Sequence, residues 1–222
     1  MPGSKAFSHY LKKYYKTTMR KFILDINPAT GELVEKIKCS SPGEVASGVK
    51  LARKASKSWH LVPMKKRAHL FKNIAKDLAK EKEKIGELIT LEMGKLYKSA
   101  MGEVEGTAYA IEENIILAEK AAAVETFKED KQITELHRHP LGVVAVITPW
   151  NFPIGMPESL LSPAILMGNT AVFKPSENTP LTGKALYDVF NKHLPKGVIN
   201  LVQGAEEVGE ALLKSDIDMV AF

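Results

Sequence analysis

The pattern of apolar and polar positions first predicts a β-hairpin. Residues 22–26 and 33–37 alternate apolar and polar side chains, and the run Asn27-Pro-Ala-Thr-Gly31 lies between them. Alternation is typical of strands with one buried face, and Asn, Pro and Gly favour turn conformations. We therefore expect two short strands joined by a tight turn.

A helical period follows. The capping box Ser41-Pro-Gly-Glu44 predicts a helix to about Trp59, and Pro63 opens a longer one that Gly94 is placed to end. The longer helix has apolar residues three or four positions apart, at Phe71, Ile74, Ala75, Leu78, Ile85, Leu88 and Ile89. A third helix has a continuous apolar stripe, at Met101, Val104, Ala108, Ile111, Ile115, Ala118 and Ala122.

The second half of the chain alternates strands with helices. Residues 134–139 alternate as a strand does, and the later strands are apolar almost throughout: 142–148, 170–173, 198–202 and 218–222. Helical stretches separate these later strands, at 156–167, 181–193 and 206–214. This order predicts an α/β fold, a Rossmann-like parallel sheet with flanking helices. Because 218–222 reads as a central strand with nothing after it, we expect an incomplete copy of a larger fold.

Composition narrows the class of protein. The chain has 222 residues, and 31 Lys and Arg against 26 Asp and Glu give a net charge of +5. Cys39 is the only cysteine, which excludes an internal disulfide and a Cys-based zinc site and fits a reducing compartment. The longest apolar run, 141–149, is too short to span a bilayer. We expect a soluble cytoplasmic protein with no metal site and no membrane or nucleic-acid partner.

Residues 1–24 form a basic arm with interleaved aromatic residues and no acid before Asp25. It could bind a membrane surface or target an organelle, or it could pack on its own domain. Neither the apolar core of a secretory signal nor the Arg and Ser bias of a transit peptide is present. We favour the packed arm.

Candidate chemistry lies where the predicted parallel strands end, because open parallel sheets bind ligands there. No Gly-x-Gly-x-x-Gly follows the first of these strands, so the standard dinucleotide fingerprint is absent. The loop Pro149-Trp-Asn-Phe-Pro153 instead holds Asn151 between two prolines that fix φ. A rigid carboxamide can donate to developing negative charge, and it can equally serve its own loop backbone.

Lys174 and Glu177 follow the second of these strands. An ammonium and a carboxylate three residues apart can bracket vicinal hydroxyls. Glu177 also lies 29 residues after Thr148, near the spacing at which an acid binds ribose in dinucleotide folds. The alternative is that Ser176 or Glu177 caps the next helix, which is the commoner use of such residues.

Several longer motifs resemble the aldehyde dehydrogenase superfamily, and in particular bacterial succinate-semialdehyde dehydrogenases. They run in family order from about Phe22 to the end of the chain: Asn27–Gly31, Leu91-Glu-Met-Gly-Lys95, 143–153, 162–177, Thr179-Pro180, 197–204 and 216–222. The family oxidises aldehydes to acids with NAD or NADP, through a Cys thiolate and a Glu that activates water.

The resemblance implies site residues and partners. Asn151 would donate to the oxyanion, and Lys174 and Glu177 would bind the adenosine ribose. NAD is the favoured cofactor, but Ser176 and Lys174 leave NADP possible. The remaining cofactor-site residues would be Ile147, Thr148, Pro149 and Trp150 at the junction with the aldehyde, and Gly204 and Gly209 near the adenine and pyrophosphate. The strand at 134–139 resembles part of an oligomerisation arm, so a homo-oligomer is expected.

We divide the chain accordingly into a basic arm (1–24), a helical part of the cofactor-binding domain (25–130), an arm strand (131–141) and a Rossmann-like part (142–222). The sequence lacks the family's nucleophilic Cys and its Glu-Leu-Gly-Gly motif. Cys39 lies 112 residues before Asn151, has no evident basic partner to lower its pKa, and cannot replace the nucleophile. We therefore expect a catalytically incomplete fragment of the enzyme. The alternatives are a non-catalytic dinucleotide-binding module and an interaction protein that pairs through the strand at 218–222.

Overall fold

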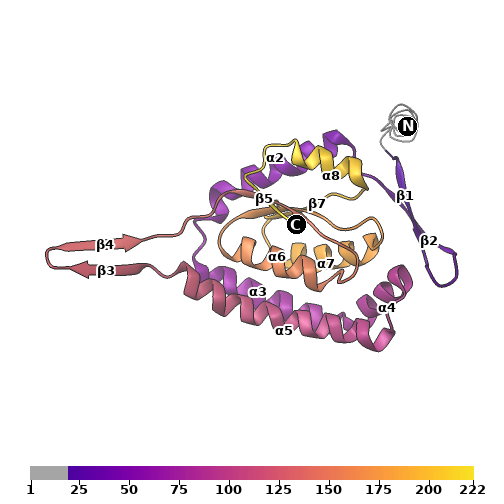
Figure 1. Ribbon diagram of the computed structural model, residues 1–222, viewed down its shortest axis with the longest axis horizontal. Coiled ribbons are helices and arrows are strands. Elements are labelled where there is room, and N and C mark those ends of the chain that lie inside the picture. Colours follow the sequence, from indigo (N-terminus) through magenta and orange to yellow (C-terminus); the bar gives the residue numbers. More distant parts are fainter. Residues whose placement is uncertain (1–19) are drawn as a thin grey trace, which may run out of the picture.

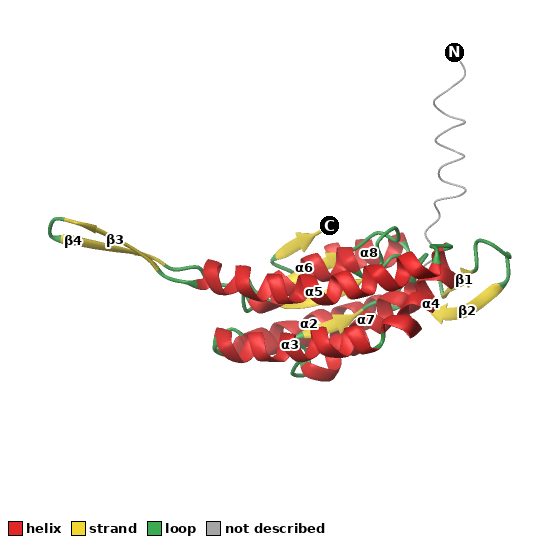
Figure 2. Ribbon diagram, turned by 90° about the horizontal axis from the view of Figure 1, so that it is seen from below, coloured by secondary structure: helices red, strands yellow, loops and turns green. Residues whose placement is uncertain are grey.

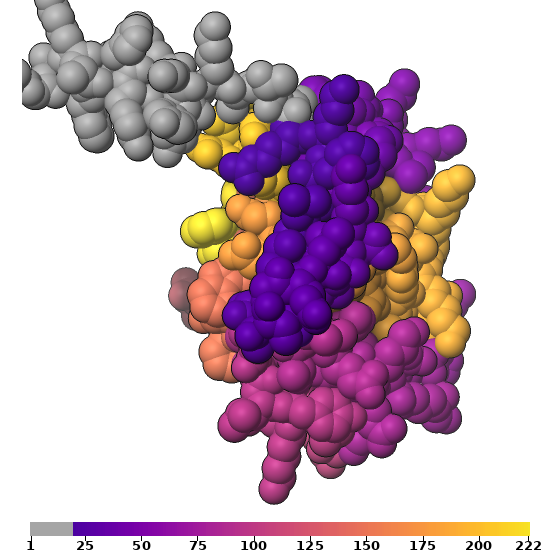
Figure 3. All heavy atoms as spheres, turned by 90° about the vertical axis from the view of Figure 1, so that its right-hand side faces the viewer, coloured from indigo at the N-terminus to yellow at the C-terminus, as the bar shows by residue number. Residues whose placement is uncertain are grey.

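The computed structural model describes residues 20–222. Residues 1–19 of the predicted basic arm therefore lie outside the described part of the chain. Strands β1 (Phe22–Ile26) and β2 (Leu33–Lys38) pair antiparallel and confirm the predicted hairpin. In its turn, Asn27 accepts hydrogen bonds from Gly31 N at its carbonyl (2.8 Å) and from Ala29 N at its side chain (2.9 Å). The hairpin lies across one end of the molecule, where it borders the C-terminal half of the chain (Figure 3).

The first predicted helix is confirmed as α2 (Pro42–Trp59). Ser41 Oγ accepts from Glu44 N (3.2 Å) and Glu44 Oε2 accepts from Ser41 N (2.7 Å), which completes the capping box. The second predicted helix is wrong in one respect, because it is two helices, α3 (Met64–Lys80) and α4 (Lys82–Met93), that meet at Glu81. Between Leu78 and Ile85 the positions that should continue the apolar stripe are Glu81 and Lys82, so no buried side chain keeps the helix straight there. Gly94 ends α4 with φ of +73°.

A two-stranded arm follows the long helix α5 (Tyr97–Ala122). Strands β3 (Glu125–Glu129) and β4 (Gln132–Leu136) form an antiparallel hairpin that projects away from the body (Figures 1 and 2). The strand predicted over 134–139 therefore lies slightly earlier, and its partner β3 was not predicted. Every residue of both strands is exposed, so burial leaves no alternation for a sequence pattern to reveal.

The second half confirms the α/β fold. Four parallel strands, β5 (Val143–Ile147), β6 (Thr170–Lys174), β7 (Ile199–Leu201) and β8 (Met219–Ala221), lie in the order β7-β6-β5-β8 within the described chain. Helices connect them, namely α6 (Gly155–Leu166), α7 (Pro180–His193) and α8 (Glu206–Leu213). The predicted strands and crossovers are all present, with bounds that differ by a residue or two.

Helices cover both faces of this sheet (Figure 1). Val144 and Val146 point to one face, where they pack in a core with residues of α3, α5, α6 and α7. Val143 and Ala145 point to the other face and pack with residues of α2 and α8. Alternate side chains of β5 therefore serve two cores, which explains why the strand is apolar throughout.

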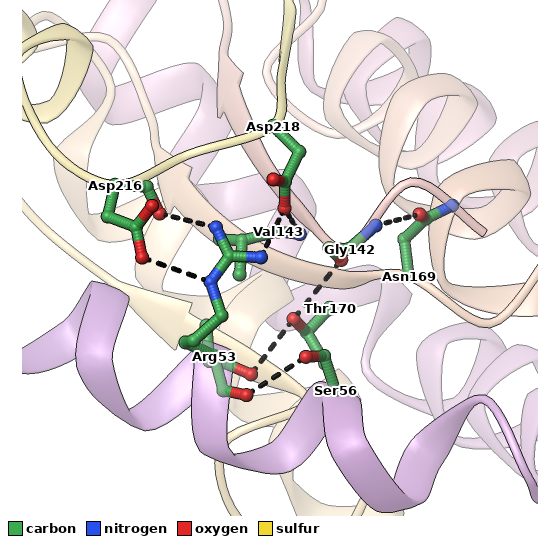
Figure 4. Close-up of polar contacts among 9 residues, drawn as sticks. Arg53, Ser56, Gly142, Val143, Asn169, Thr170, Asp216 and Asp218 are labelled. Carbon is green, nitrogen blue, oxygen red and sulfur yellow. Dashed lines mark hydrogen bonds and ion pairs between the residues drawn. The ribbon is translucent and has the colours of Figure 1, made fainter.

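Strand β8 is held at the edge of the described sheet. It pairs with β5 from Val144↔Met219 to Val146↔Ala221, and Met219 and Val220 are 45% and 42% exposed. This exposure differs from the burial expected of a central strand over 218–222. The reason is that β8 has one neighbouring strand among the described residues, namely β5. Arg53 of α2 anchors the segment through Asp216 and Asp218, and Asp218 also accepts from Val143 N at 2.6 Å (Figure 4).

Candidate functional site at the carboxyl edge of the sheet

The ends of β5 and β6 bring the predicted site segments together. Ile147 pairs with Lys174 in the parallel register, and Thr148 N donates to Lys174 O at 3.2 Å. The loops that follow the two strands therefore leave the sheet at the same edge. The Thr148 hydroxyl is buried there and meets no hydrogen-bond partner among the described residues.

Lys174 is buried at this edge. Its Nζ donates to Pro175 O at 3.3 Å and lies 3.8 Å from Glu177 Oε2, and burial lowers the pKa of its ammonium. Its stem runs past Gly209 of α8, where a Cβ would lie 3.7 Å from Lys174 Cε. Lys174, Glu177 and Gly209, which are far apart in the sequence, therefore share one place in the fold.

Gly204 and Ser176 shape the neighbouring backbone. A Cβ on Gly204 would lie 2.2 Å from a methyl carbon of Val208, so the turn between β7 and α8 favours glycine, and any larger residue would force a shift. Ser176 is buried, and its Oγ accepts from Asn178 N at 3.2 Å in the turn after β6. The predicted residues after β6 and β7 thus form the rim of one edge.

The structure bears on the capping alternative for Glu177. The N–H groups of Leu181 and Thr182 at the start of α7 donate to the buried carboxylate of Glu92, at 2.6 and 2.8 Å. Glu177 remains beside Lys174, with 41% of its side chain exposed. The cap of α7 therefore comes from α4, a contact that no local sequence pattern predicted.

The loop with Asn151 stands beside this edge. Asn151 is exposed and Trp150 is 47% exposed. Trp150 and Glu177 line a cavity of about 450 Å³, with Asp25 and Glu92 in its buried wall. Burial raises the pKa of Glu92 to about 7 and raises that of Asp25, one of whose oxygens meets no hydrogen-bond partner within residues 20–222.

Two further residues hold the Asn151 loop and were not predicted as site residues. Lys95 Nζ donates to Asn151 O at 3.0 Å, and Glu103 Oε1 accepts from Ile154 N at 3.1 Å. Lys95 belongs to the motif Leu91–Lys95, which the sequence offered only as a family resemblance. Glu103 lies on α5, and only the fold brings it to the loop.

Comparison with known proteins decides the family. A model described as "Aldehyde dehydrogenase family" matches residues 14–222. The chain belongs to the aldehyde dehydrogenase family. This aldehyde dehydrogenase chain is 39% identical over 206 residues to malonate-semialdehyde dehydrogenase 2 of Geobacillus thermodenitrificans, a match that covers 88% of this chain and 41% of the relative. A malonate-semialdehyde dehydrogenase 2 of Bacillus mycoides is 34% identical and matches all of this chain against 47% of its own length.

Solved structures agree with the assignment. The NADP-dependent glyceraldehyde-3-phosphate dehydrogenase of Bacillus halodurans C-125, complexed with NADP, superposes with a TM-score of 0.85 at 34% identity. That match covers 93% of this aldehyde dehydrogenase chain and 45% of the solved chain. GapN of Methanocaldococcus jannaschii, also complexed with NADP, gives a TM-score of 0.86 at 30% identity over 91% of this chain and 46% of its own.

The aldehyde dehydrogenase chain spans less than half the length of the relatives it matches. Within residues 20–222, no helix is both long enough and apolar enough to cross a membrane. The same residues hold no cluster of three or more metal-binding side chains of the His, Cys, Asp and Glu types.

Proposed function

We propose that this chain forms the cofactor-binding part of an NAD(P)-dependent aldehyde dehydrogenase. One observation carries the proposal: the buried ammonium of Lys174 lies 3.8 Å from the half-exposed carboxylate of Glu177 at the carboxyl edge of a parallel sheet. Ligands of such sheets bind at this edge. A donor and an acceptor side by side suit two neighbouring hydroxyls, as on a ribose.

The surroundings fit a dinucleotide. Gly204 lets the turn after β7 pack closely against Val208, and Gly209 lets the Lys174 stem pass close to the backbone of α8. The Thr148 hydroxyl is a buried group that a ligand could satisfy. Glu177 would repel a 2′-phosphate, which favours NAD, while Lys174 and Ser176 offer donors that leave NADP possible. A bound NAD or NADP would supply the hydride acceptor for the oxidation.

Asn151 is the proposed donor to the substrate oxygen. It lies on an exposed loop between Pro149 and Pro153, next to Trp150, which shares a cavity with Glu177. Ile147 to Trp150 would then line the junction between cofactor and aldehyde. A carboxamide held by a stiff loop can stabilise negative charge on the carbonyl oxygen as a thiolate attacks the carbon.

The proposed substrate of the complete enzyme is a short semialdehyde. The two relatives compared above are malonate-semialdehyde dehydrogenases, so malonate semialdehyde is the first substrate to test and succinate semialdehyde the second. We also propose that the β3–β4 arm pairs with other copies in a cytoplasmic homo-oligomer, because its exposed strands carry Phe127, Ile133 and Leu136 on the surface.

The 222 residues of the chain do not supply the nucleophile. Cys39, the one cysteine of the sequence, is buried in the core with Ile37 and Val45, and burial raises the pKa of its thiol. A thiolate is the reactive form, so this side chain is unsuited to attack a carbonyl. We expect the chain alone to bind cofactor without oxidising aldehydes.

Titration calorimetry with NAD+ and NADP+ tests the proposal. We expect wild-type chain to bind NAD+, and Glu177→Ala to weaken NAD+ binding roughly tenfold, because a charged hydrogen bond is lost. The same variant should lose less affinity for NADP+, since a repelling charge is removed. Glu210→Ala, which removes an exposed carboxylate on α8, is the matched control.

Two results would count against the proposal. Absence of heat with NAD+ and NADP+ at millimolar concentration would reject the cofactor site. Reduction of NAD+ by the isolated chain with malonate or succinate semialdehyde would reject the expectation that it is catalytically incomplete.

A further inference from the structure

We propose that Lys95 and Glu103 are positioning residues that fix the loop carrying Asn151. We refer to these two residues as the loop clasp. Their importance for catalysis rests on the proposed function of Asn151, whereas the contacts of the clasp are independent of it. The clasp joins three parts of the chain: the turn after α4, the first part of α5, and residues 151–155.

Glu103 caps the start of α6 from another helix. Its carboxylate is 7% exposed, and Oε1 accepts from Ile154 N at 3.1 Å and from Gly155 N at 3.2 Å. The first N–H groups of a helix have no partner within the helix, and Ile154 has no side-chain oxygen to satisfy them. A carboxylate is favoured at this end of the helix dipole. Glu103 therefore sets where the loop ends and α6 begins.

Lys95 holds the other half of the loop. Its Nζ pairs with Glu103 Oε2, donates to Asn151 O at 3.0 Å and lies 4.4 Å from the ring centroid of Phe152. The Lys95 side chain is 16% exposed, so these contacts are largely shielded from water. One ammonium thus contacts the backbone of Asn151 and the side chain of the next residue.

The burial of this pair favours a positioning role. Burying two charges costs free energy unless additional hydrogen bonds satisfy them, and here the additional bonds from Lys95 and to Glu103 all involve residues 151–155. Pro149 and Pro153 restrict φ on either side of Asn151, and together with the loop clasp they favour a single backbone conformation at Asn151. The carboxamide then projects from a fixed Cα, which a preorganised donor needs.

A purely structural role would stabilise the packing of α5 on α6 without affecting Asn151. Amide hydrogen exchange and nitrogen-15 NMR of the full chain separate the two roles. In Glu103→Ala we expect the amides of Ile154 and Gly155 to exchange roughly tenfold faster or more, relative to Val172 in β6, because both lose a charged acceptor. Glu103→Gln keeps an acceptor oxygen and should restore most of this protection.

Glu105→Ala is the matched control, because Glu105 lies on the same helix with 57% of its side chain exposed and pairs only with Lys82, at 3.5 Å, among the described residues. We expect it to leave both amides unchanged. Lys95→Met should shift and broaden the side-chain amide signals of Asn151, and Lys95→Arg should restore them, since Arg keeps the charge.

Unchanged exchange at Ile154 and Gly155 in folded Glu103→Ala would overturn the proposal, as would an increase shared equally by Val172. Asn151 side-chain signals that do not respond to Lys95→Met would also overturn it. If the wild-type chain binds no NAD+, the proposed function fails, while the exchange and NMR results still decide the clasp.

Discussion

Arg53→Met tests how β8 is held to the sheet. Arg53 Nη1 donates to Asp218 Oδ2 at 2.5 Å, Nε donates to Asp216 Oδ2 at 3.2 Å, and Nη2 donates to Asp216 O at 2.8 Å. Met keeps much of the apolar stem and removes all three bonds. Among the described residues, the Asp218 carboxylate would then keep one hydrogen bond, the one it accepts from Val143 N.

The contacts differ in strength. The Asp216 side chain is 82% exposed, so its ion pair with Arg53 contributes little. The Arg53 and Asp218 side chains are 28% and 32% exposed, and their bond is charge-assisted. A hydrogen bond between charged groups of this kind contributes about 2 kcal/mol, so we expect Arg53→Met to lower the free energy of unfolding by about that amount.

The effect should depend on pH. Arg53 holds the pKa of Asp218 below its usual 3.8, chiefly through their hydrogen bond. A carboxyl whose pKa is lower in the folded state stabilises the fold above its unfolded pKa and loses that contribution as pH falls through the folded pKa. The difference between Arg53→Met and wild type should therefore be full at pH 7 and shrink below about pH 4.

Urea unfolding at pH 7 measures the loss, which corresponds to a midpoint shift of roughly 1 M. Lys50→Met, an exposed change one turn away on α2, is the control. Hydrogen exchange at Val220 and Ala221 reports β8 directly. An unfolding free energy equal to that of Lys50→Met within about 0.5 kcal/mol, with unchanged β8 protection, would refute the reasoning.

Two other substitutions test the site's scaffold. Burial raises the pKa of Glu92 from 4.5 to about 7, which means that the fold stabilises the neutral form of this carboxyl. The free energy of unfolding should therefore fall by about 3 kcal/mol as the pH rises from 4.5 to 7. Denaturant unfolding of Glu92→Gln should show a flatter pH profile than that of the wild type. An equally steep profile in the variant would assign the titration to other groups. Gly204→Ala places a Cβ about 2.2 Å from Val208, so we expect thermal unfolding to show a loss of roughly 1–3 kcal/mol in the free energy of unfolding. The double variant with Val208→Ala should recover part of this loss, and additive losses would contradict the predicted overlap.

Local patterns predicted the framework because its signals are local. The capping box at Ser41, the turn after Asn27 and the stop at Gly94 each depend on residues within a few positions, and all are found as predicted. The parallel strands were recognisable because both faces of β5 are buried, which makes the strand apolar throughout.

The remaining features depend on contacts between distant residues or on exposure. Strand β3 is fully exposed, so no alternation marks it. Glu92 caps α7 from 89 residues away, and Glu103 caps α6 from 51 residues away, so neither carboxylate differs locally from a surface glutamate. Asn151 was recognisable by its two prolines, whereas the residues that hold its loop were visible only in the fold.

The pairing of β5 with β8 also has a consequence for how the protein is made. Val144 lies opposite Met219, 75 positions later in the chain, and the strands β6 and β7 lie between them in the sequence. During synthesis on the ribosome, one side of β5 therefore waits without its neighbour while β6 and β7 assemble on the other. Long-range parallel pairing of this kind slows folding and leaves an unpaired strand edge that is transiently exposed and prone to aggregation. We expect newly made chains to depend on chaperones until the late segment arrives and Asp218 meets Arg53.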